Sequence, residues 1–166
     1  MLRPESAQLS GGNFIFNFRK GVPYMTVNLT VSSVIDELDD AGLPCDSNKT
    51  DVSCSATLTV ADGVSTLLYT TEENGQKTDT EIQIMKEAVR VIRRGAIESD
   101  FLFEEKKSFT SLYKIPPYAF DAEIYTKRIR KSEKDGATEI SIIYDMTVGE
   151  AKKNVRMKIS YPGGSI

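Results

Sequence analysis

Two neighbouring stretches near the C-terminus decide the fold: TEISIIYDMTV at residues 138–148 and NVRMKISY at residues 154–161. In both stretches apolar and polar residues alternate, which is the two-residue period of a half-buried β-strand. The short turn Gly149-Glu150 separates them, so we predict an antiparallel hairpin with one face in the core. The residues expected inward on this hairpin and on the strand before it are Phe120, Ala122, Ile124, Ile140, Ile142, Tyr144, Val155, Met157 and Ile159.

The same alternation extends upstream to Met25. The dipeptides Asp62-Gly63 and Asp135-Gly136 separate strand-like stretches and are strong signals for hairpin turns. No long helical pattern occurs in the 166 residues. The pattern predicts an all-β protein, either a sandwich or a barrel, and the sequential hairpins favour a single antiparallel up-and-down barrel of about 8–10 strands.

The domain boundaries follow from where the alternation begins. We expect residues 25–166 to form one barrel domain and residues 1–24 to be a leader, either mobile or contributing an edge strand. The edge-strand alternative rests on Phe14, Phe16 and Phe18, which alternate with other residues and are costly to leave exposed. Residues 39–51, which contain Gly42 and Pro44, are expected to form a loop.

Composition excludes several kinds of catalytic site. The chain has no His, so it cannot carry a Ser-His-Asp triad, a Cys-His pair, an HExxH zinc site or a His proton shuttle. Carboxylates and tyrosines are available as acids and bases, but no spacing singles out a pair. We therefore expect a protein that is not an enzyme and has no catalytic residues, no metal and no cofactor.

Charge and targeting signals bound the location and the partners. The net charge of −3 is too small to indicate a nucleic-acid or membrane partner. A basic cluster at residues 127–134 is interrupted by Glu133 and is expected to be a solvated hairpin tip. No signal peptide or apolar membrane span is visible, so we expect a cytoplasmic protein in which Cys45 and Cys54 are free thiols.

Four segments resemble a known bacterial family: VIRRGA at residues 91–96, YKIPPY at 113–118, ISIIYDMTVG at 140–149 and ISYPGG at 159–164. In order and spacing they are similar to the YwiB-like family, across roughly residues 25–164. The resemblance implies a calycin-like (lipocalin-like) β-barrel and a cytosolic bacterial setting, with no established activity. Residues 39–51 and the leader look like departures from the family pattern. The chain has no Trp and so lacks the GxW motif of true lipocalins.

Charged residues on apolar strand faces are the candidate functional residues. Arg93 shares the parity of Val89 and Val91, and Glu72 that of Thr66 and Leu68, so both are expected to point inward at strand ends. In one interpretation they pair structurally at the barrel rim. In the other, Arg93 anchors an anionic group of a ligand, because its planar fork matches carboxylate and phosphate.

The expected function is binding of a small ligand inside the barrel, with Arg93, Glu72 and Tyr144 as the candidate binding residues. An eight- to ten-stranded barrel is wide enough to hold one small ligand. The alternative is a protein-interaction or structural module that acts through an exposed barrel face or as a homodimer. A hollow barrel interior would favour ligand binding, and a filled interior would favour the interaction module.

Overall fold

A computed structural model describes the backbone of residues 5–8, 15–19 and 22–163, and the side chains of residues 23–163. Every element in these residues is a β-strand. The strands are β1 (Glu5–Gln8), β2 (Ile15–Arg19), β3 (Val22–Leu38), β4 (Pro44–Ala61), β5 (Val64–Glu73), β6 (Gln76–Ile84), β7 (Ala88–Gly95), β8 (Ser99–Glu104), β9 (Ser108–Ile115), β10 (Tyr118–Lys134), β11 (Ala137–Val148) and β12 (Ala151–Pro162). The described part of the chain contains no helix with the length and hydrophobicity of a membrane span.

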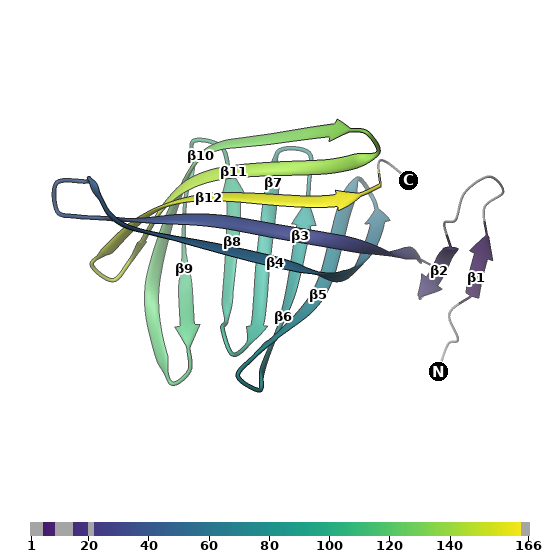
Figure 1. The fold of residues 1–166 in the computed structure, drawn as a ribbon, viewed down its shortest axis with the longest axis horizontal. Helices are drawn as coiled ribbons and strands as arrows, with labels where there is room; N and C mark the ends of the chain where they lie inside the picture. The colour runs from purple at the N-terminus through teal and green to yellow at the C-terminus, as the bar shows by residue number, and fades with distance from the viewer. Residues whose placement is uncertain (1–4, 9–14, 20–21, 164–166) are drawn as a thin grey trace.

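Strands β3 to β12 form a nearly closed antiparallel barrel. Their spatial order is β8-β7-β6-β5-β4-β3-β12-β11-β10-β9, so almost every strand pairs with its neighbours in sequence. The exception is β12, which returns to pair with β3. In Figure 1, β3, β4, β11 and β12 cross in front of β5 to β9. The predicted all-β, up-and-down barrel is confirmed.

Tight Asp-Gly turns connect two of the hairpins as expected. Asp62 and Asp135 have a φ of 54°, and the glycines that follow them have φ values of 77° and 76°. Positive φ at both central residues is the mark of a type I′ turn, whose twist matches that of the flanking strands. These turns set the registers of β4 with β5 and of β10 with β11.

The C-terminal hairpin lies in the core, as its alternation predicts. Ile142 of β11 pairs with Met157 of β12, and Ile140 pairs with Ile159. All four side chains are buried. Phe120 differs from the expectation: it is 41% exposed, because this part of β10 pairs only with β9 at the end of the barrel.

A seam remains between β8 and β9, because the two strands form no continuous ladder. One isolated bridge joins them, in which the Glu98 amide donates to the Lys114 carbonyl at 2.9 Å and the Lys114 amide to the Glu98 carbonyl at 2.8 Å. Aromatic rings fill the space beside the bridge. Phe101 of β8 stacks on Tyr113 of β9 at a centroid separation of 6.2 Å and meets Phe103 edge-on at 6.4 Å.

The segment expected to be a loop at residues 39–51 is mostly strand. Strand β4 begins at Pro44 and pairs with β3 from there to Thr59. Only the turn between the strands is irregular, and the Asp39 carboxylate accepts hydrogen bonds from the amides of Ala41 and Leu43, at 2.9 Å each. The loop prediction is wrong because this half of β4 is exposed on both faces, which gives a polar sequence without alternation.

The two cysteines lie on this same strand. Cys45 and Cys54 are both free thiols, as expected. They are nine residues apart in extended β4, which places them about 30 Å from one another at ~3.3 Å per residue. A disulfide between them is therefore incompatible with the strand.

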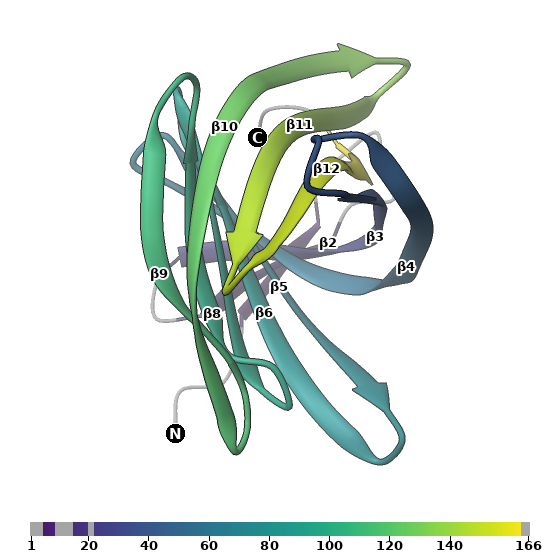
Figure 2. The same cartoon turned by 90° about the vertical axis from the view of Figure 1, so that its left-hand side faces the viewer.

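Strands β4 and β5 separate toward one end of the barrel. They pair only from Thr57 to Ala61 of β4, and β5 then continues from Tyr69 to Glu73 paired with β6 alone. Among the described residues, no strand pairs with this edge of β4 at residues 44–56. Figure 2 shows β4 and the β5–β6 hairpin extending in different directions. The result is a lateral opening in the barrel wall.

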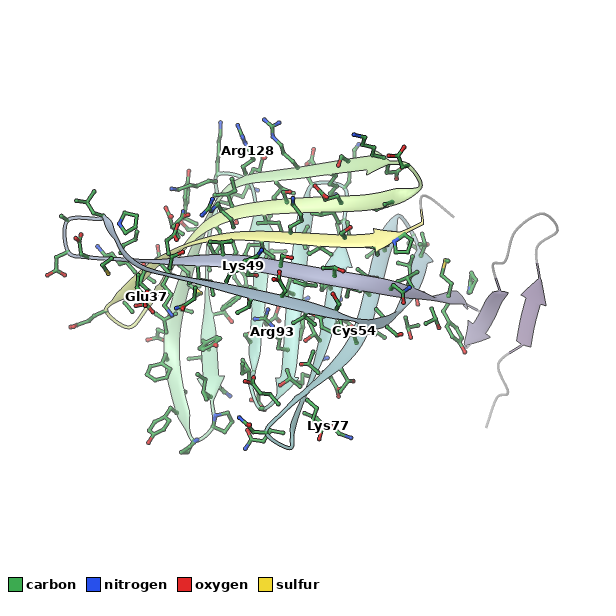
Figure 3. The ribbon with its side chains drawn as sticks, viewed as in Figure 1. Glu37, Lys49, Cys54, Lys77, Arg93 and Arg128 are labelled. Atoms are coloured by element: carbon green, nitrogen blue, oxygen red, sulfur yellow. The ribbon has the colours of Figure 1, made fainter. Side chains whose placement is uncertain are left out.

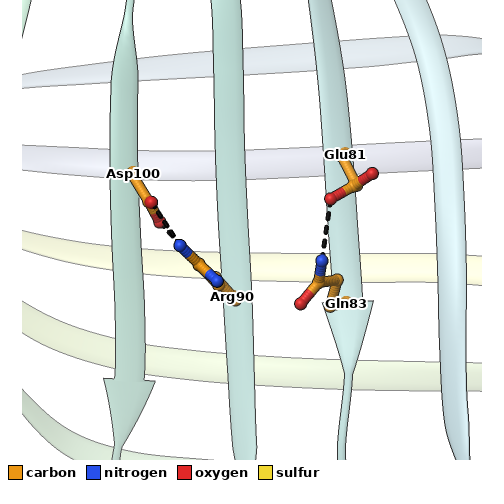
Figure 4. A network of polar contacts seen from close by, with 4 residues as sticks. All are labelled: Glu81, Gln83, Arg90 and Asp100. Atoms are coloured by element: carbon orange, nitrogen blue, oxygen red, sulfur yellow. Dashed lines mark hydrogen bonds and ion pairs between the residues drawn. The ribbon is translucent and has the colours of Figure 1, made fainter.

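The outer face of β6 to β8 is polar. Arg90 Nε donates to Asp100 Oδ1 at 2.8 Å, and Gln83 Nε2 to Glu81 Oε2 at 2.7 Å (Figure 4). The hydrogen bond from Arg90 lowers the pKa of the Asp100 carboxyl. Because both partners are about two-fifths exposed, we expect this ion pair to contribute little stability.

The first 24 residues, expected to be a leader, contain β1, β2 and the start of β3. Strand β1 pairs with β2, and β2 pairs with the first residues of β3. Figure 1 places both short strands to one side of the barrel. Of the three alternating phenylalanines, Phe16 and Phe18 fall in β2, and Phe14 lies outside the described residues.

Candidate ligand pocket between β4 and β5

Arg93 points into the barrel from the end of β7. The burial of Val89 and Val91 defines the inward face of this strand, and Arg93 continues it. Its neighbours across the sheet are Thr80 of β6 and Ser99 of β8. The sequence-based prediction that Arg93 lies on the inner face is therefore confirmed.

A pocket of about 400 Å³ occupies the opening between β4 and β5, and Arg93 lines it. Residues from six strands, from the β5–β6 turn and from the turn after β7 form its walls. They include Val31 of β3, Val52 of β4, Tyr69 of β5, Thr78 and Thr80 of β6, and Arg93 of β7. Thr50 and Val52 of β4 line the pocket together with Arg93, which is labelled in Figure 3.

Arg93 and the residue opposite it carry polar groups without partners. Among the described residues, no hydrogen bond or ion pair joins the Arg93 guanidinium to an acceptor. The buried hydroxyl of Ser99, opposite Arg93, has no hydrogen-bond partner either. Leaving a buried polar group unsatisfied costs about 1–3 kcal/mol. Thr78 and Thr80, both buried, add two more hydroxyls to this end of the barrel.

Two tyrosines near Arg93 hold their protons strongly. Burial raises the pKa of Tyr144 to about 12, and the positive charge of Arg93 partly opposes this rise. Burial also raises the pKa of Tyr69, again against the effect of Arg93. Tyr144 packs against Phe103 with ring centroids 4.6 Å apart. At neutral pH these phenols are therefore hydrogen-bond donors and not bases.

The raised pKa of Tyr144 predicts a loss of stability in alkali. The unfolded chain releases this proton near pH 10 and the folded protein only near pH 12, so the free energy of unfolding falls as the pH rises between these values. Two pKa units correspond to about 3 kcal/mol. Tyr144→Phe should flatten the dependence of the denaturation midpoint on pH above 10. The exposed-residue control Tyr118→Phe should leave it unchanged, and an equal slope in both variants would contradict the assignment.

Glu72 lies on the opposite face from the one expected. It is exposed on the outside of β5 and pairs across the sheet with Lys77, so it does not meet Arg93. The inward side of β5 carries Leu67, Tyr69, Thr71 and, at the pocket, Glu73, while Leu68 is 41% exposed. The parity was misassigned because Leu67, Leu68 and Tyr69 are all apolar, and either face is then consistent with the sequence.

Of the three predicted residues, Arg93 alone lines the pocket; Tyr144 is buried in the core where the charge of Arg93 still affects its pKa, and Glu72 points outward. Sequence reasoning missed Tyr69, Ser99 and the two threonines of β6. The threonines had a usable signal, because Thr78 and Thr80 share the parity of the buried Ile82 and Ile84. Within the described residues, no group of three or more His, Cys, Asp or Glu side chains is placed to hold a metal ion.

A family model described as "Domain of unknown function (DUF1934)" matches residues 39–159. This chain belongs to the DUF1934 family. The matched range begins at residue 39, so it includes the segment 39–51 that the sequence analysis set apart from the family pattern. Membership confirms the resemblance to YwiB-like proteins and assigns no activity.

Two comparisons connect this DUF1934 chain to a bacterial relative. The "Uncharacterized beta-barrel protein YwiB" of Bacillus subtilis (strain 168) is 30% identical over 100 residues, which are 60% of this chain and 70% of the relative. The crystal structure of the ywiB protein from Bacillus subtilis superposes with a TM-score of 0.71 at 27% identity. The superposition covers 86% of this chain and 94% of the other.

Proposed function

We propose that this protein binds a small anionic ligand without transforming it, in the pocket between β4 and β5. The observation that carries the proposal is the unpaired guanidinium of Arg93 facing a pocket of about 400 Å³. A partly buried arginine without an acceptor is costly, and a carboxylate or phosphate satisfies its fork through two parallel hydrogen bonds. The hydroxyls of Thr78 and Thr80, which line the same pocket, supply further donors.

A binding role fits the groups around Arg93 better than catalysis does. No carboxylate is buried in the described residues, and the chain has no His. Burial raises the pKa of both nearby tyrosines, Tyr69 and Tyr144, which makes them poor general bases at neutral pH. The donors around Arg93 are suited to holding an anion, and the one carboxylate that lines the pocket, that of Glu73, is exposed to solvent.

Ligand-induced stabilisation tests the proposal. A ligand that binds only the folded state at 100 times its Kd stabilises it by about 2.7 kcal/mol. For a protein of this size that raises the Tm by about 5–10 °C. We expect such a shift for at least one small carboxylate or phosphate ester in a thermal-shift screen, and we expect Arg93→Met to abolish it while remaining folded.

The adjacent Arg94 provides a matched control. Arg94 is exposed, with outward parity on β7, so Arg94→Met removes the same charge from the chain without reaching the pocket. This variant should keep the full thermal shift. An equal loss in both variants would mean that the shift reflects net charge and not a site at Arg93.

A second candidate function is self-association through the β9–β10 hairpin. Three exposed large apolar residues share one face at the end of this hairpin, Ile115, Tyr118 and Phe120, whereas Leu112 and Tyr125 lie on its other face. Exposed apolar patches of this kind are typical of protein interfaces. Light scattering after gel filtration measures the mass directly. A dimer that Tyr118→Ser with Phe120→Ser converts to a monomer supports this function, and a monomeric wild type at high concentration excludes it.

A further inference from the structure

We propose that the anion held by Arg93 is the C-terminal carboxylate of an extended peptide that adds as a strand to the free edge of β4. This inference rests on the anion binding proposed above. It goes further by assigning the rest of the ligand to the backbone groups of β4.

The edge of β4 is available over a long stretch. At residues 44–56 it pairs with β3 on one side, and no described strand pairs with it on the other. An unpaired edge presents a row of amide donors and carbonyl acceptors, and extended peptides bind such edges through main-chain hydrogen bonds. These bonds require no particular peptide sequence, so the edge supplies affinity for any extended chain.

The edge leads directly into the Arg93 pocket. Thr50 and Val52 of β4 line the same cavity as Arg93, together with Tyr69 on the facing strand. A peptide paired with this part of β4 therefore has its end within the pocket. The free edge and the unpaired guanidinium are two halves of one binding surface.

The longer part of the free edge sets the direction of the peptide. Thr50 and Val52, the residues of β4 that line the pocket, lie near the middle of the strand, and the free edge extends from them back to Pro44. A peptide that pairs with residues 44–50 and ends in the pocket runs parallel to β4. Val31, Val52 and Tyr69 then provide apolar contact for its last side chain.

Charges along the edge argue against a second copy of this chain as the occupant. Asp46, Lys49 and Asp51 are all exposed on β4. Charged residues on an edge strand are a common device against edge-to-edge association between copies. A peptide of different sequence meets no such restriction, and its free carboxylate complements Arg93.

The experiment compares two libraries of N-acetylated hexapeptides, randomised at all six positions. One library carries free C-terminal carboxylates and the other C-terminal amides. Each is passed over the immobilised full-length protein, and the retained peptides are identified by mass spectrometry. We expect the free-acid library to be enriched and its best members to lose at least tenfold in affinity when amidated or when tested against Arg93→Met, but not against Arg94→Met.

NMR titration locates the bound peptide. With ¹⁵N-labelled protein, the best free-acid peptide should shift the backbone amides of residues 44–56 and the Arg93 Nε resonance together. When the peptide nitrogens are methylated one at a time, binding should weaken at every second position, because only alternate amides of a strand face a given partner.

Sodium acetate and inorganic phosphate separate this inference from the proposed function. If either anion shifts the Arg93 Nε resonance while no peptide is retained, the pocket binds anions and the peptide inference is overturned. Equal retention of amidated peptides also overturns it. If neither the anions nor the peptides affect Arg93, both the inference and the proposed function fail.

Discussion

Replacing Ile142 with Asp is expected to unfold most of the protein. Ile142 has no exposed surface, and it pairs with the buried Met157 at the centre of the C-terminal hairpin. The new carboxylate would have no hydrogen-bonding partner in a purely apolar setting, and it would also leave part of the volume of the isoleucine unfilled. We expect a loss of several kcal/mol, a large fraction of the stability of an ordinary domain.

Ile143→Asp is the matched control. Ile143 is the next residue of β11, and its outward side chain is only partly buried. The same substitution there leaves the carboxylate in contact with water, so the urea midpoint should fall much less than for Ile142→Asp. Similar midpoints for the two variants would contradict the assignment of faces in β11.

Gly95→Ala is expected to have the second large effect, through the backbone. Gly95 has a φ of +134°, and a Cβ atom built on it would lie 2.2 Å from the carbonyl oxygen of Lys77. That carbonyl accepts a hydrogen bond from the Ala96 amide at 3.0 Å, so it cannot move away freely. The substitution should lower the free energy of unfolding by more than about 2 kcal/mol, because it combines this overlap with a φ that residues other than glycine rarely adopt.

The control for this substitution is Gly136→Ala. Gly136 also has a positive φ, +76°, but an added Cβ would meet nothing within 4 Å. This variant should lose only about 1 kcal/mol, which is the cost of the conformation alone. A thermal denaturation series of both variants separates the two contributions. Equal losses would show that β6 and β7 rearrange easily around Lys77.

Because Gly95 lies two residues after Arg93, the same strain should reach the pocket. At low temperature, where the variant remains folded, we expect Gly95→Ala to weaken the anion response of Arg93. Gly136 is at the turn between β10 and β11 and should leave that response intact.

The sequence predicted the C-terminal hairpin well because its alternation is strict. Ile140, Ile142 and Tyr144 occupy every second position and face the core. Ile143 is the only apolar residue on the outer face between them. Strand β5 shows the opposite case. With Leu67, Leu68 and Tyr69 in succession, its inner face depends on packing against β4 and β6, which a single sequence does not reveal.

The pocket was predictable only in part, for a related reason. Arg93 stood out as a charge on an apolar face, and the structure places it there. The opening beside it depends on where β4 leaves β5, and no local pattern marks that point. The exposed half of β4 has the composition of a loop, so its strand character becomes apparent only through its pairing with β3.

The seam between β8 and β9 determines how this barrel comes apart. Elsewhere neighbouring strands share at least part of a ladder, whereas here one bridge between Glu98 and Lys114, the rings of Phe101 and Tyr113, and hydrogen bonds between the β8–β9 turn and Thr126 close the wall. Few hydrogen bonds break when this line opens, so we expect the sheet to open here at a lower free energy than full unfolding requires. Amide protons along the facing edges of β8 and β9 should therefore exchange with solvent before those of β11 and β12. Such an opening would let small molecules enter and leave the interior while most of the ladder stays intact.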